Sequence, residues 1–347
     1  MRTRVLRALP AALVLAAVAL AGCGSDDDDP AAGSAAGGEA TESVQLLLPA
    51  PAGINFLGYH VAKERFWKEE GLDVEGVVTD GSSVVAQQLV SGNGSYGVLG
   101  AASLYLADTE GAELRGIATL THDDVARLSV PESSEVTDAT QLAGKAIGIP
   151  AAGDGSVPLV EAVLESSQID PADVEMPVVG AGGPAVVRAL QSGRIAAYAH
   201  GQSDIPGIEI QGRTPLRSIM PESFVGLPGN VLGVTQETLD DPAKREIAVK
   251  LARGWLKAGQ FLSTNREEAL QIGCDSVPEE CQDMAVAELQ SELSAETQSP
   301  LVAEAPGTTP EDKATTLIEA VAGEITIPIS DVLLNEYVEQ IDAKVEG

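Results

Sequence analysis

The sequence predicts an α/β protein with two lobes, each built on a mostly parallel sheet flanked by helices. The first observation is the segment Val77–Ser103, in which an apolar run, a Gly/Ser turn, a helical stretch and a second apolar run follow one another. Such a strand–helix–strand crossover joins parallel strands. The second observation is that its turn residues recur 101 residues later, at Gly182, Ser192 and Gly193. The third is length, since residues 43–347 exceed what one hydrophobic core usually serves.

Each element of this segment has its own signal. Val77-Val78 suits a buried strand, because β-branched residues fit a covered, pleated surface. Ser82 or Ser83 is placed to cap the helix that follows, and Ser91-Gly92 ends it. Tyr96–Gly100 is the next strand. Two unrelated crossovers would share some glycines, but the matches fall on turns, caps and core faces. We therefore interpret the repeat as two similar lobes.

The chain begins with a targeting segment. Arg2, Arg4 and Arg7 precede a short apolar stretch over residues 11–20. This pattern predicts a signal peptide at residues 1–22, because the apolar stretch is too short to span a bilayer comfortably. The sequence Leu-Ala-Gly-Cys that ends at Cys23 resembles the bacterial lipobox, in which the cysteine is lipidated. An ordinary secretory signal is the alternative. Lipid on Cys23 would anchor the protein to the extracytoplasmic face of the cell membrane.

Residues 23–42, which begin with this cysteine, are mostly Asp, Gly, Ser and Ala. They offer almost no apolar surface to bury, so we expect a disordered tether. The whole chain carries a formal net charge of −31, and removal of the first 22 residues would remove three arginines and no acid. Nucleic acid is therefore not expected as a partner, because binding phosphates requires a basic surface.

The remaining elements divide the chain between the lobes. Strands are predicted at residues 43–48 and 114–120, a helix at 59–70, and helices from residue 241 onward. The chain is expected to cross to the second lobe over residues 125–130 and to return between residues 217 and 234. The first lobe then comprises residues 43–121 with 228–347, and the second residues 122–227. Two crossings form a hinge that lets the lobes close over a ligand.

Several spaced motifs resemble one known family. They are the stretch from Tyr59 that reads YHVAKERFWKEEGLDVE, the sequences DGSS and YGVLG that follow, and DATQLAGKAIGIP ending at Pro150. In this order they resemble the solute-binding proteins of ABC importers, and in particular the nitrate/sulfonate/taurine and thiamine-precursor (pyrimidine) binding family. The resemblance covers residues 43 to about 270. It implies a periplasmic-binding-protein-like fold of type II with a two-strand hinge. It also implies capture of a small organic solute, delivery to an ABC-transporter permease, and a monomer.

Catalysis is not expected. The chain has three histidines and lacks G-x-S-x-G, H-E-x-x-H and P-loop motifs. Neither a cofactor nor a metal is predicted. Cys274 and Cys281 flank a proline turn in an exported chain, so a disulfide is expected there; a metal site would lack nearby histidine.

The ligand is expected where strands end and loops enter helices, beyond the carboxyl ends of the strands. The loops of the two repeats and the first crossing give the candidates. For each serine, N-capping and ligand contact both remain open, and His122 could have a structural role instead. The predicted ligand-binding residues are Asn55, Gly81, Ser82, Ser83, Ala102, Ser103, Thr121, His122, Asp154, Ser156, Gln202 and Asp204.

The charge of these loops bears on the ligand. They hold Asp154 and Asp204 but no Lys or Arg. This favours a nitrogen-bearing ligand such as a thiamine-precursor-like aminopyrimidine, stacked on Tyr59, Tyr105 or Tyr198. Helix N-termini instead favour a sulfonate, taurine or nitrate anion, and this alternative stays open. A lipid-anchored sensor or interaction module that does not take part in transport is the alternative from another class.

Overall fold

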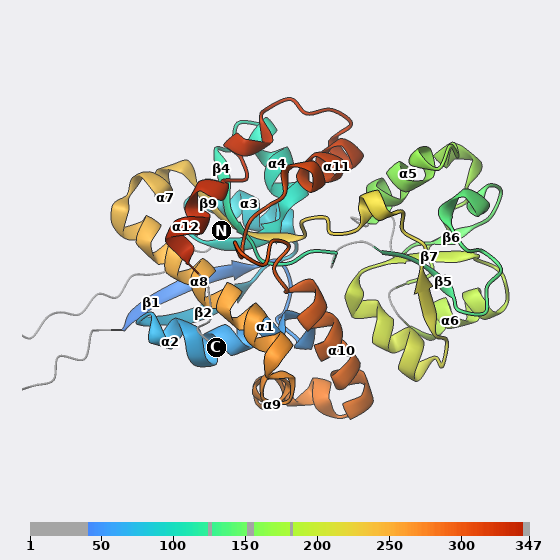
Figure 1. Ribbon diagram of the computed structural model, residues 1–347, viewed down its shortest axis with the longest axis horizontal. Coiled ribbons are helices and arrows are strands. Elements are labelled where there is room, and N and C mark those ends of the chain that lie inside the picture. The colour runs from blue at the N-terminus through green and yellow to red at the C-terminus, as the bar shows by residue number, and fades with distance from the viewer. Residues whose placement is uncertain (1–40, 124–126, 151–155, 181–182, 343–347) are drawn as a thin grey trace, which may run out of the picture. The chain divides into compact units, whose positions relative to one another are not determined.

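Two sheets organise the computed structural model, which describes residues 41–123, 127–150, 156–180 and 183–342 (Figure 1). In the described residues the larger sheet has the strand order β2-β1-β3-β9-β4. β1 pairs parallel with β2 and β3, as expected for strands joined by helical crossovers. β9 lies antiparallel between β3 and β4. The strands are β1 Glu42–Leu48, β2 Leu72–Val78, β3 Gly97–Gly100, β4 Leu114–Thr119 and β9 Asn230–Thr235.

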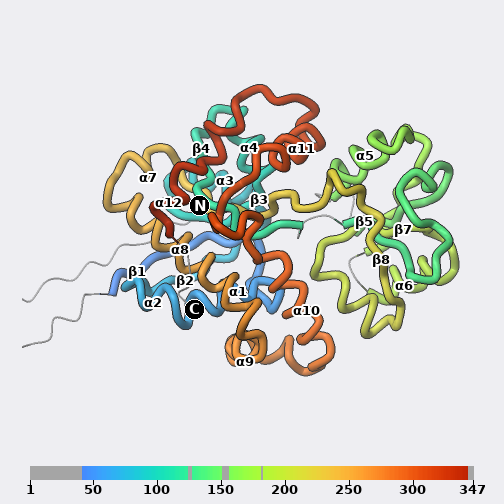
Figure 2. The backbone as a smooth tube through the Cα atoms, viewed as in Figure 1, coloured from blue at the N-terminus to red at the C-terminus, as the bar shows by residue number. Residues whose placement is uncertain are grey.

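The smaller sheet has the order β6-β7-β5-β8 in the described residues. β6 pairs parallel with β7, whereas β5 is antiparallel to both β7 and β8. Residues 219–229 connect the last strand of this sheet to β9 of the larger one, which Figure 2 traces along the backbone. The strands are β5 Arg127–Pro131, β6 Ile147–Gly148, β7 Ala197–His200 and β8 Leu216–Ser218.

The fold class is as predicted, but the expectation of mostly parallel sheets needs a correction, because both sheets are mixed. The parallel pairings join strands linked by helices within one sheet. The antiparallel pairings all involve β5 or β9. β5 is the first strand after the chain enters the smaller sheet, and β9 is the first strand after the chain returns to the larger sheet. A strand that arrives without a crossover helix can pair in either direction. The apolar pattern of β9 carried no information on its direction.

The predicted repeat is present in the structure. Leu47 of β1 pairs with Gly97 of β3, and Gly148 of β6 pairs with Tyr198 of β7, so both partners shift by the same 101 residues. The helices between these strands end alike, at α3 Ser82–Val90 and α6 Pro184–Gln191. Each is followed by Ser and then by a glycine, at φ 73° and φ 70°. Positive φ favours glycine, which explains why this punctuation recurs.

Helices cover both sheets. The predicted helix at 59–70 is a continuous run: α1 Leu57–Val61, a π-helical turn at Ala62–Phe66 and α2 Trp67–Glu69. In the described residues no helix is both long and apolar enough to cross a membrane. The other helices are α4 Ala101–Thr109, α5 Ser156–Ser166, α7 Gln236–Asp240, α8 Pro242–Thr264, α9 Arg266–Ser276, α10 Met284–Thr297, α11 Glu311–Ala322 and α12 Val338–Ile341.

α8 is the longest of these helices and packs on the larger sheet. Asp241 caps it by accepting hydrogen bonds from the Ala243 and Lys244 N–H groups, with Pro242 at its first position. Its Trp255 is buried against Trp67, with ring centroids 6.1 Å apart. The Trp67 indole donates to the Leu251 carbonyl over 2.9 Å, so the polar atom of this buried ring is satisfied. α8 thus returns to the larger sheet, as expected for the helix that follows residue 241.

Candidate functional site

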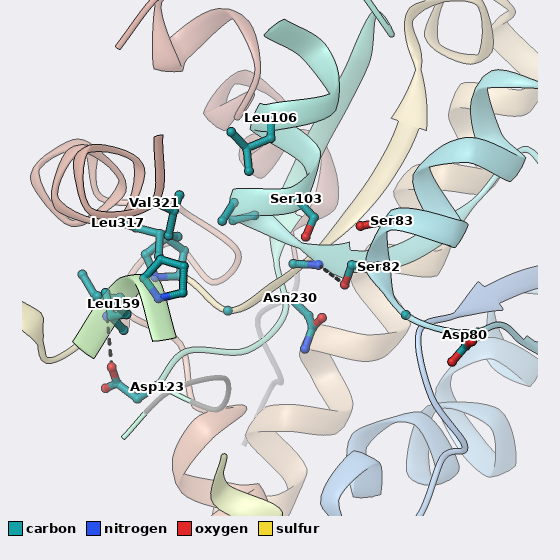
Figure 3. Close-up of a pocket in the computed structure, with 18 residues that line it drawn as sticks. Asp80, Ser82, Ser83, Ser103, Leu106, Asp123, Leu159, Asn230, Leu317 and Val321 are labelled. Atoms are coloured by element: carbon teal, nitrogen blue, oxygen red, sulfur yellow. Dashed lines mark hydrogen bonds between the residues drawn. The ribbon is translucent and has the colours of Figure 1, made fainter. Parts of the chain in front are cut away.

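The loops after β2 and β3 open onto a cavity of about 490 Å³ (Figure 3). We call it the serine cavity, because Ser82, Ser83 and Ser103 line it. Gly81 and Ala102 line it as well, so five of the predicted residues come together here. The cavity is closed by residues that the prediction did not name: Asn230, Asp123, Leu106, Leu159, Leu227, Leu317, Val321 and their neighbours.

Ser82 has a different role from the predicted cap. The residue that precedes α3 is Gly81, at φ 95°, and no side chain caps the helix. The Ser82 hydroxyl oxygen instead accepts a hydrogen bond from the Gly100 N–H over 3.0 Å, which ties the loop after β2 to the end of β3 (Figure 3). Its own O–H meets no acceptor among the described residues and can donate to a ligand. The cap position holds glycine because the backbone there is left-handed, which a serine side chain would strain.

The serine cavity is rich in hydrogen-bond donors at one end. α3 and α4 both begin there, and the first N–H groups of a helix have no partner within the helix. Ser103 is half-buried in the first turn of α4, and Ser83 lies in the first turn of α3. Neither hydroxyl has a hydrogen bond to the described residues. Two helix N-termini and these serines therefore present donors to an acceptor group of a ligand.

The other end of the serine cavity is apolar. Leu159 comes from α5, which packs on the smaller sheet, whereas Leu317 and Val321 come from α11. Leu106 and Leu227 complete this wall. The cavity thus receives side chains from helices of both halves of the fold. It suits a ligand with a polar head and a carbon body.

No Lys, Arg or His lines the serine cavity in the described part of the chain. Its acidic residues are Asp80, which is exposed, and Asp123. The Asp123 carboxylate accepts hydrogen bonds from the Gly226 and Leu227 N–H groups over 2.8–3.1 Å. Burial alone would raise the pKa of Asp123, but the hydrogen bonds from His122 and the Gly226 N–H outweigh it and lower the pKa below its ordinary value.

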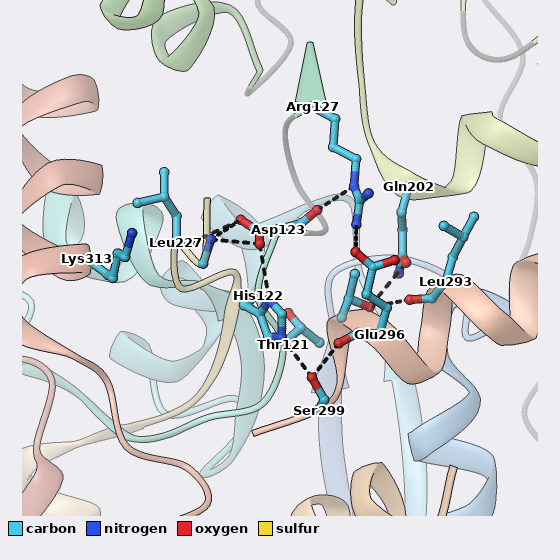
Figure 4. A network of polar contacts seen from close by, with 12 residues as sticks. Thr121, His122, Asp123, Arg127, Gln202, Leu227, Leu293, Glu296, Ser299 and Lys313 are labelled. Carbon is cyan, nitrogen blue, oxygen red and sulfur yellow. Dashed lines mark hydrogen bonds and ion pairs between the residues drawn. The ribbon is translucent and has the colours of Figure 1, made fainter. Parts of the chain in front are cut away.

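The predicted residues at the first crossing hold the connections between the sheets together (Figure 4). The buried Thr121 hydroxyl accepts from the Asn230 N–H over 2.7 Å. The His122 ring lies 3.2 Å from the Ser299 hydroxyl and 3.3 Å from the Asp123 carboxylate. His122 is therefore bound on both ring nitrogens and does not line the serine cavity. The structure favours the structural role that was left open for it.

Asn55 and Gln202 meet each other instead of the serine cavity. Gln202 is buried and its amide nitrogen lies 3.5 Å from the Asn55 carbonyl oxygen. Its amide oxygen accepts a hydrogen bond from the Thr297 hydroxyl over 3.1 Å. Gln202 follows β7 of the smaller sheet, whereas Thr297 ends α10. This contact joins the two halves of the fold.

The remaining predicted residues also lie apart from the serine cavity. Asp204 accepts a hydrogen bond from the Tyr198 hydroxyl over 2.9 Å, and Ser156 is fully buried at the start of α5. Asp154 and Cys23 fall outside the described residues. The predicted disulfide between Cys274 and Cys281 is confirmed, with the two Cα atoms 5.6 Å apart.

None of the three tyrosines proposed for stacking lines the serine cavity. Tyr59 packs against Trp67 and Trp255 in the core of the larger sheet. Tyr105 and Tyr198 are fully buried, and their hydroxyls bond to the Ile327 and Gly180 carbonyls. The stacking expectation is wrong, because strand and helix faces that follow apolar periodicity point into the core.

In the described residues there is also no group of three or more His, Cys, Asp or Glu side chains that could hold a metal ion.

Sequence reasoning missed the residues that close the serine cavity. Asn230 had a signal, because it follows Pro228-Gly229 within the predicted second crossing. Leu317 and Val321 had none, because they belong to a helix beyond the recognised motifs and read as ordinary core positions.

Comparisons with known proteins identify structures of similar fold. A protein of Bordetella bronchiseptica RB50 shares 23% identity and a TM-score of 0.63, over 86% of this chain and 96% of that one. The periplasmic nitrate-binding protein NrtA from Synechocystis PCC 6803 shares 14% identity and a TM-score of 0.62, over 87% and 88%. The periplasmic aliphatic sulphonate binding protein SsuA from Escherichia coli shares 15% identity and a TM-score of 0.59, over 81% and 86%.

These similarities establish the fold, which is that of periplasmic binding proteins. A search of the curated proteins found no match. The sequence profile described as NMT1/THI5 like matches residues 53–269, which is more than half of the chain. The predicted family resemblance is confirmed, and the chain belongs to the NMT1/THI5-like family.

Proposed function

We propose that this protein is the solute-binding component of an ABC importer and that it captures a small organic solute in the serine cavity. The observation that carries the proposal is the composition of this cavity. Two helix N-termini and three serines form one end of it, and leucines from helices of both halves of the fold form the other. Such a cavity binds and releases a molecule. No His, Lys or Cys lines it among the described residues, and the Asp123 carboxylate is engaged by the Gly226 and Leu227 N–H groups.

The donor end supports a ligand with a hydrogen-bond-accepting head group. Backbone N–H groups at helix starts can only donate, and they carry the positive end of the helix dipole. The Ser83 and Ser103 hydroxyls add donors that can rotate toward the ligand. A sulfonate or a similar oxyanion fits this set without a cationic side chain. The solved relatives of similar fold named as sulphonate-binding and nitrate-binding support the same assignment.

The apolar end supports an organic body on that head group. Leu159, Leu317 and Val321 offer carbon surface, which inorganic nitrate would leave unfilled. Burying a two-carbon chain there would stabilise the complex by about 1–2 kcal/mol. An alkanesulfonate is therefore the first candidate ligand.

A nitrogen-bearing heterocycle of the thiamine-precursor type is the second candidate. It is favoured by the lack of Lys and Arg among the described residues that line the cavity, because a neutral ligand needs no counter-charge. Its ring nitrogens would accept hydrogen bonds from the same serines. Asp204 was predicted to bind such a ligand. Its carboxylate instead accepts a hydrogen bond from the Tyr198 hydroxyl, and Asp204 does not line the serine cavity.

The proposal includes location and partners. Lipid on Cys23 would hold the protein at the extracytoplasmic face of the cell membrane, where it would meet a permease as a monomer. Replacing Cys23 with Ser should release the protein into the medium or leave its signal peptide uncleaved. Membrane fractionation with mass analysis of the N-terminus measures both, and normal processing with membrane retention would refute the anchor.

Two measurements test the ligand. Native mass spectrometry of the protein purified without refolding should detect a bound small molecule. Calorimetric titrations should then show binding of ethanesulfonate, weakened about tenfold in Ser103→Ala. Binding of an aminopyrimidine with no response to ethanesulfonate would select the second candidate. If the protein keeps the same small-angle scattering radius with saturating ligand, a rigid interaction module fits better than a transport protein.

A further inference from the structure

A groove of about 580 Å³ lies between helices α3 and α4 and continues the serine cavity. The two hollows share Ser83, Ser103 and Leu106, which line both of them. We call the second hollow the helix groove. Its other lining residues come from α3, α4 and the turn after α4, and they are Ala86, Gln87, Val90, Ser91, Ala107, Glu110, Gly111 and Ala112.

The helix groove presents carbon surface to solvent on a strongly acidic protein. Val90 of α3 has 51% of its surface exposed, and Leu106 of α4 has 41%. Both line the groove, together with the half-buried Ala107 and Ala112. Exposed apolar side chains that gather in one hollow are typical of a binding surface.

The groove leads away from the donor end of the serine cavity. Ser83 and Ser103 lie in the first turns of α3 and α4, where the free N–H groups are. Leu106 lies one turn further along α4 than Ser103 (Figure 3). Val90 is the last residue of α3 and lies about 10 Å along the helix axis from Ser83. A ligand whose head group meets the donors can therefore lay a carbon chain along the groove.

A carbon chain of the solute suits this groove better than a second copy of the protein does. Each copy carries a formal net charge of −31, and Glu110 lines the groove, so two copies would repel each other there. An alkyl chain brings no charge into the groove. It would cover Val90 and Leu106 and remove their carbon surface from water.

We propose that the solute carries a linear carbon chain that leaves the serine cavity and lies in the helix groove. The substrate class is then a long-chain alkyl compound with an oxyanion head, for which octanesulfonate is the probe. This inference rests on the proposed function, because it places the head group among the donors of the serine cavity. It goes beyond that function, because the wall formed by Leu159, Leu317 and Val321 is no part of the groove.

Calorimetry on the full chain with alkanesulfonates of increasing length tests the proposal. Each methylene that the groove half covers should tighten binding about twofold, so octanesulfonate should bind at least about tenfold more tightly than butanesulfonate. The titrations are run at constant ionic strength and below the concentration at which the sulfonates form micelles. Equal affinities for butanesulfonate and octanesulfonate would overturn the proposal.

A matched pair of variants locates the chain. Val90→Gln places an amide in the groove and should lower the ratio of octanesulfonate to ethanesulfonate affinity about fivefold. Val178→Gln makes the same change at a valine that is 53% exposed and lines neither hollow, so this ratio should keep its wild-type value. An unchanged ratio in Val90→Gln, or an equal loss in both variants, would refute the groove as the site of the chain.

Two further outcomes separate this inference from the proposed function. If ethanesulfonate does not bind, the sulfonate assignment fails, and octan-1-ol then tests the groove, because its hydroxyl oxygen can accept from the same serines. Its binding should weaken in Val90→Gln and not in Val178→Gln; no binding, or equal binding in both, would overturn the proposal. A sedimentation mass of two chains that falls to one in Val90→Gln would assign the groove to a second copy and overturn it as well.

Discussion

The two copies of the repeat share a backbone but use their polar residues differently. In the first copy, Gly97 is followed by Leu99 and Ser103. At the matching positions the second copy has Tyr198, His200 and Asp204. The pairing of Leu47 with Gly97 and of Gly148 with Tyr198 shows that these positions are structurally equivalent. Differences in side-chain contacts between the copies therefore arise from the residues themselves.

In the second copy the polar groups bind one another. The Tyr198 hydroxyl lies 2.8 Å from the Gly180 carbonyl and 2.9 Å from the Asp204 carboxylate. Its ring stacks on His200, with centroids 5.4 Å apart. His200 in turn lies 3.0 Å from the Ser129 hydroxyl. This copy uses its polar residues to stabilise its own half of the fold.

In the first copy, two of the three matching positions have no polar side chain. Gly97 has no side chain, and a Cβ there would lie 2.5 Å from Val85 Cγ1, so helix α3 packs close to the strand. With no tyrosine to bind, Ser103 is left to line the serine cavity. The proposed binding site therefore lies in the copy whose polar loop residues are not bonded to each other.

The largest expected effect is an acid sensitivity that comes mainly from His200 of the second copy. Burial lowers the pKa of His200 to about 4, whereas an unfolded histidine titrates near 6.5. The unfolded state therefore binds a proton that the folded state does not, and stability falls as pH drops from about 6.5 to 4. The loss should reach about 3 kcal/mol.

His200→Leu, which introduces the residue type of Leu99, should remove this pH dependence. Urea unfolding at pH 7, 5.5 and 4.5 measures it for both proteins. The Asp123 carboxylate and the His60 ring, whose pKa burial also lowers, are present in both proteins and cancel in the difference. Curves that fall in parallel would show that His200 is not the group responsible.

The next effect concerns the close packing in the first copy. Gly97→Val should destabilise the protein by about 2–3 kcal/mol, because the added carbons collide with Val85 and Leu89. Gly100→Ala is the matched control on the same strand, since its Cβ would meet nothing closer than the Ser82 hydroxyl at 3.6 Å. Its unfolding midpoint should stay near the wild-type value. Similar midpoints for both variants would contradict the packing argument.

A smaller effect is expected from the hydroxyl of the second copy. Tyr198→Phe keeps the stacked ring but removes the hydrogen bonds to Asp204 and Gly180. The cost should be about 1–2 kcal/mol of unfolding free energy. Solute affinity should not change, because neither residue lines the serine cavity. A variant that is equally stable but binds solute weakly would place this pair in the site instead.

Much of this structure could be predicted from the sequence, for local reasons. The strand–helix–strand units, the glycines after α3 and α6 and the disulfide all depend on residues close together in the chain. The convergence of Ser82, Ser83 and Ser103 also followed, because the ends of parallel strands meet at one edge of a sheet.

What could not be predicted depends on contacts between distant segments. Tertiary packing sets the antiparallel direction of β9. It also places Leu317 and Val321 at the serine cavity. Asp204 and Ser103 occupy equivalent positions and were given the same expected role. Only the structure shows that Tyr198 bonds to one of them, because no sequence pattern reveals which hydroxyl a carboxylate will meet.

Exchanging that pair of residues tests the central claim most directly. Calorimetric titration with ethanesulfonate should be compared for the wild type, Ser103→Asp and Asp204→Ser. The account predicts that Ser103→Asp, which places a carboxylate among the donors of the serine cavity, weakens binding by at least about tenfold. Asp204→Ser should retain the wild-type affinity. Loss of binding in Asp204→Ser together with retention in Ser103→Asp would contradict the account.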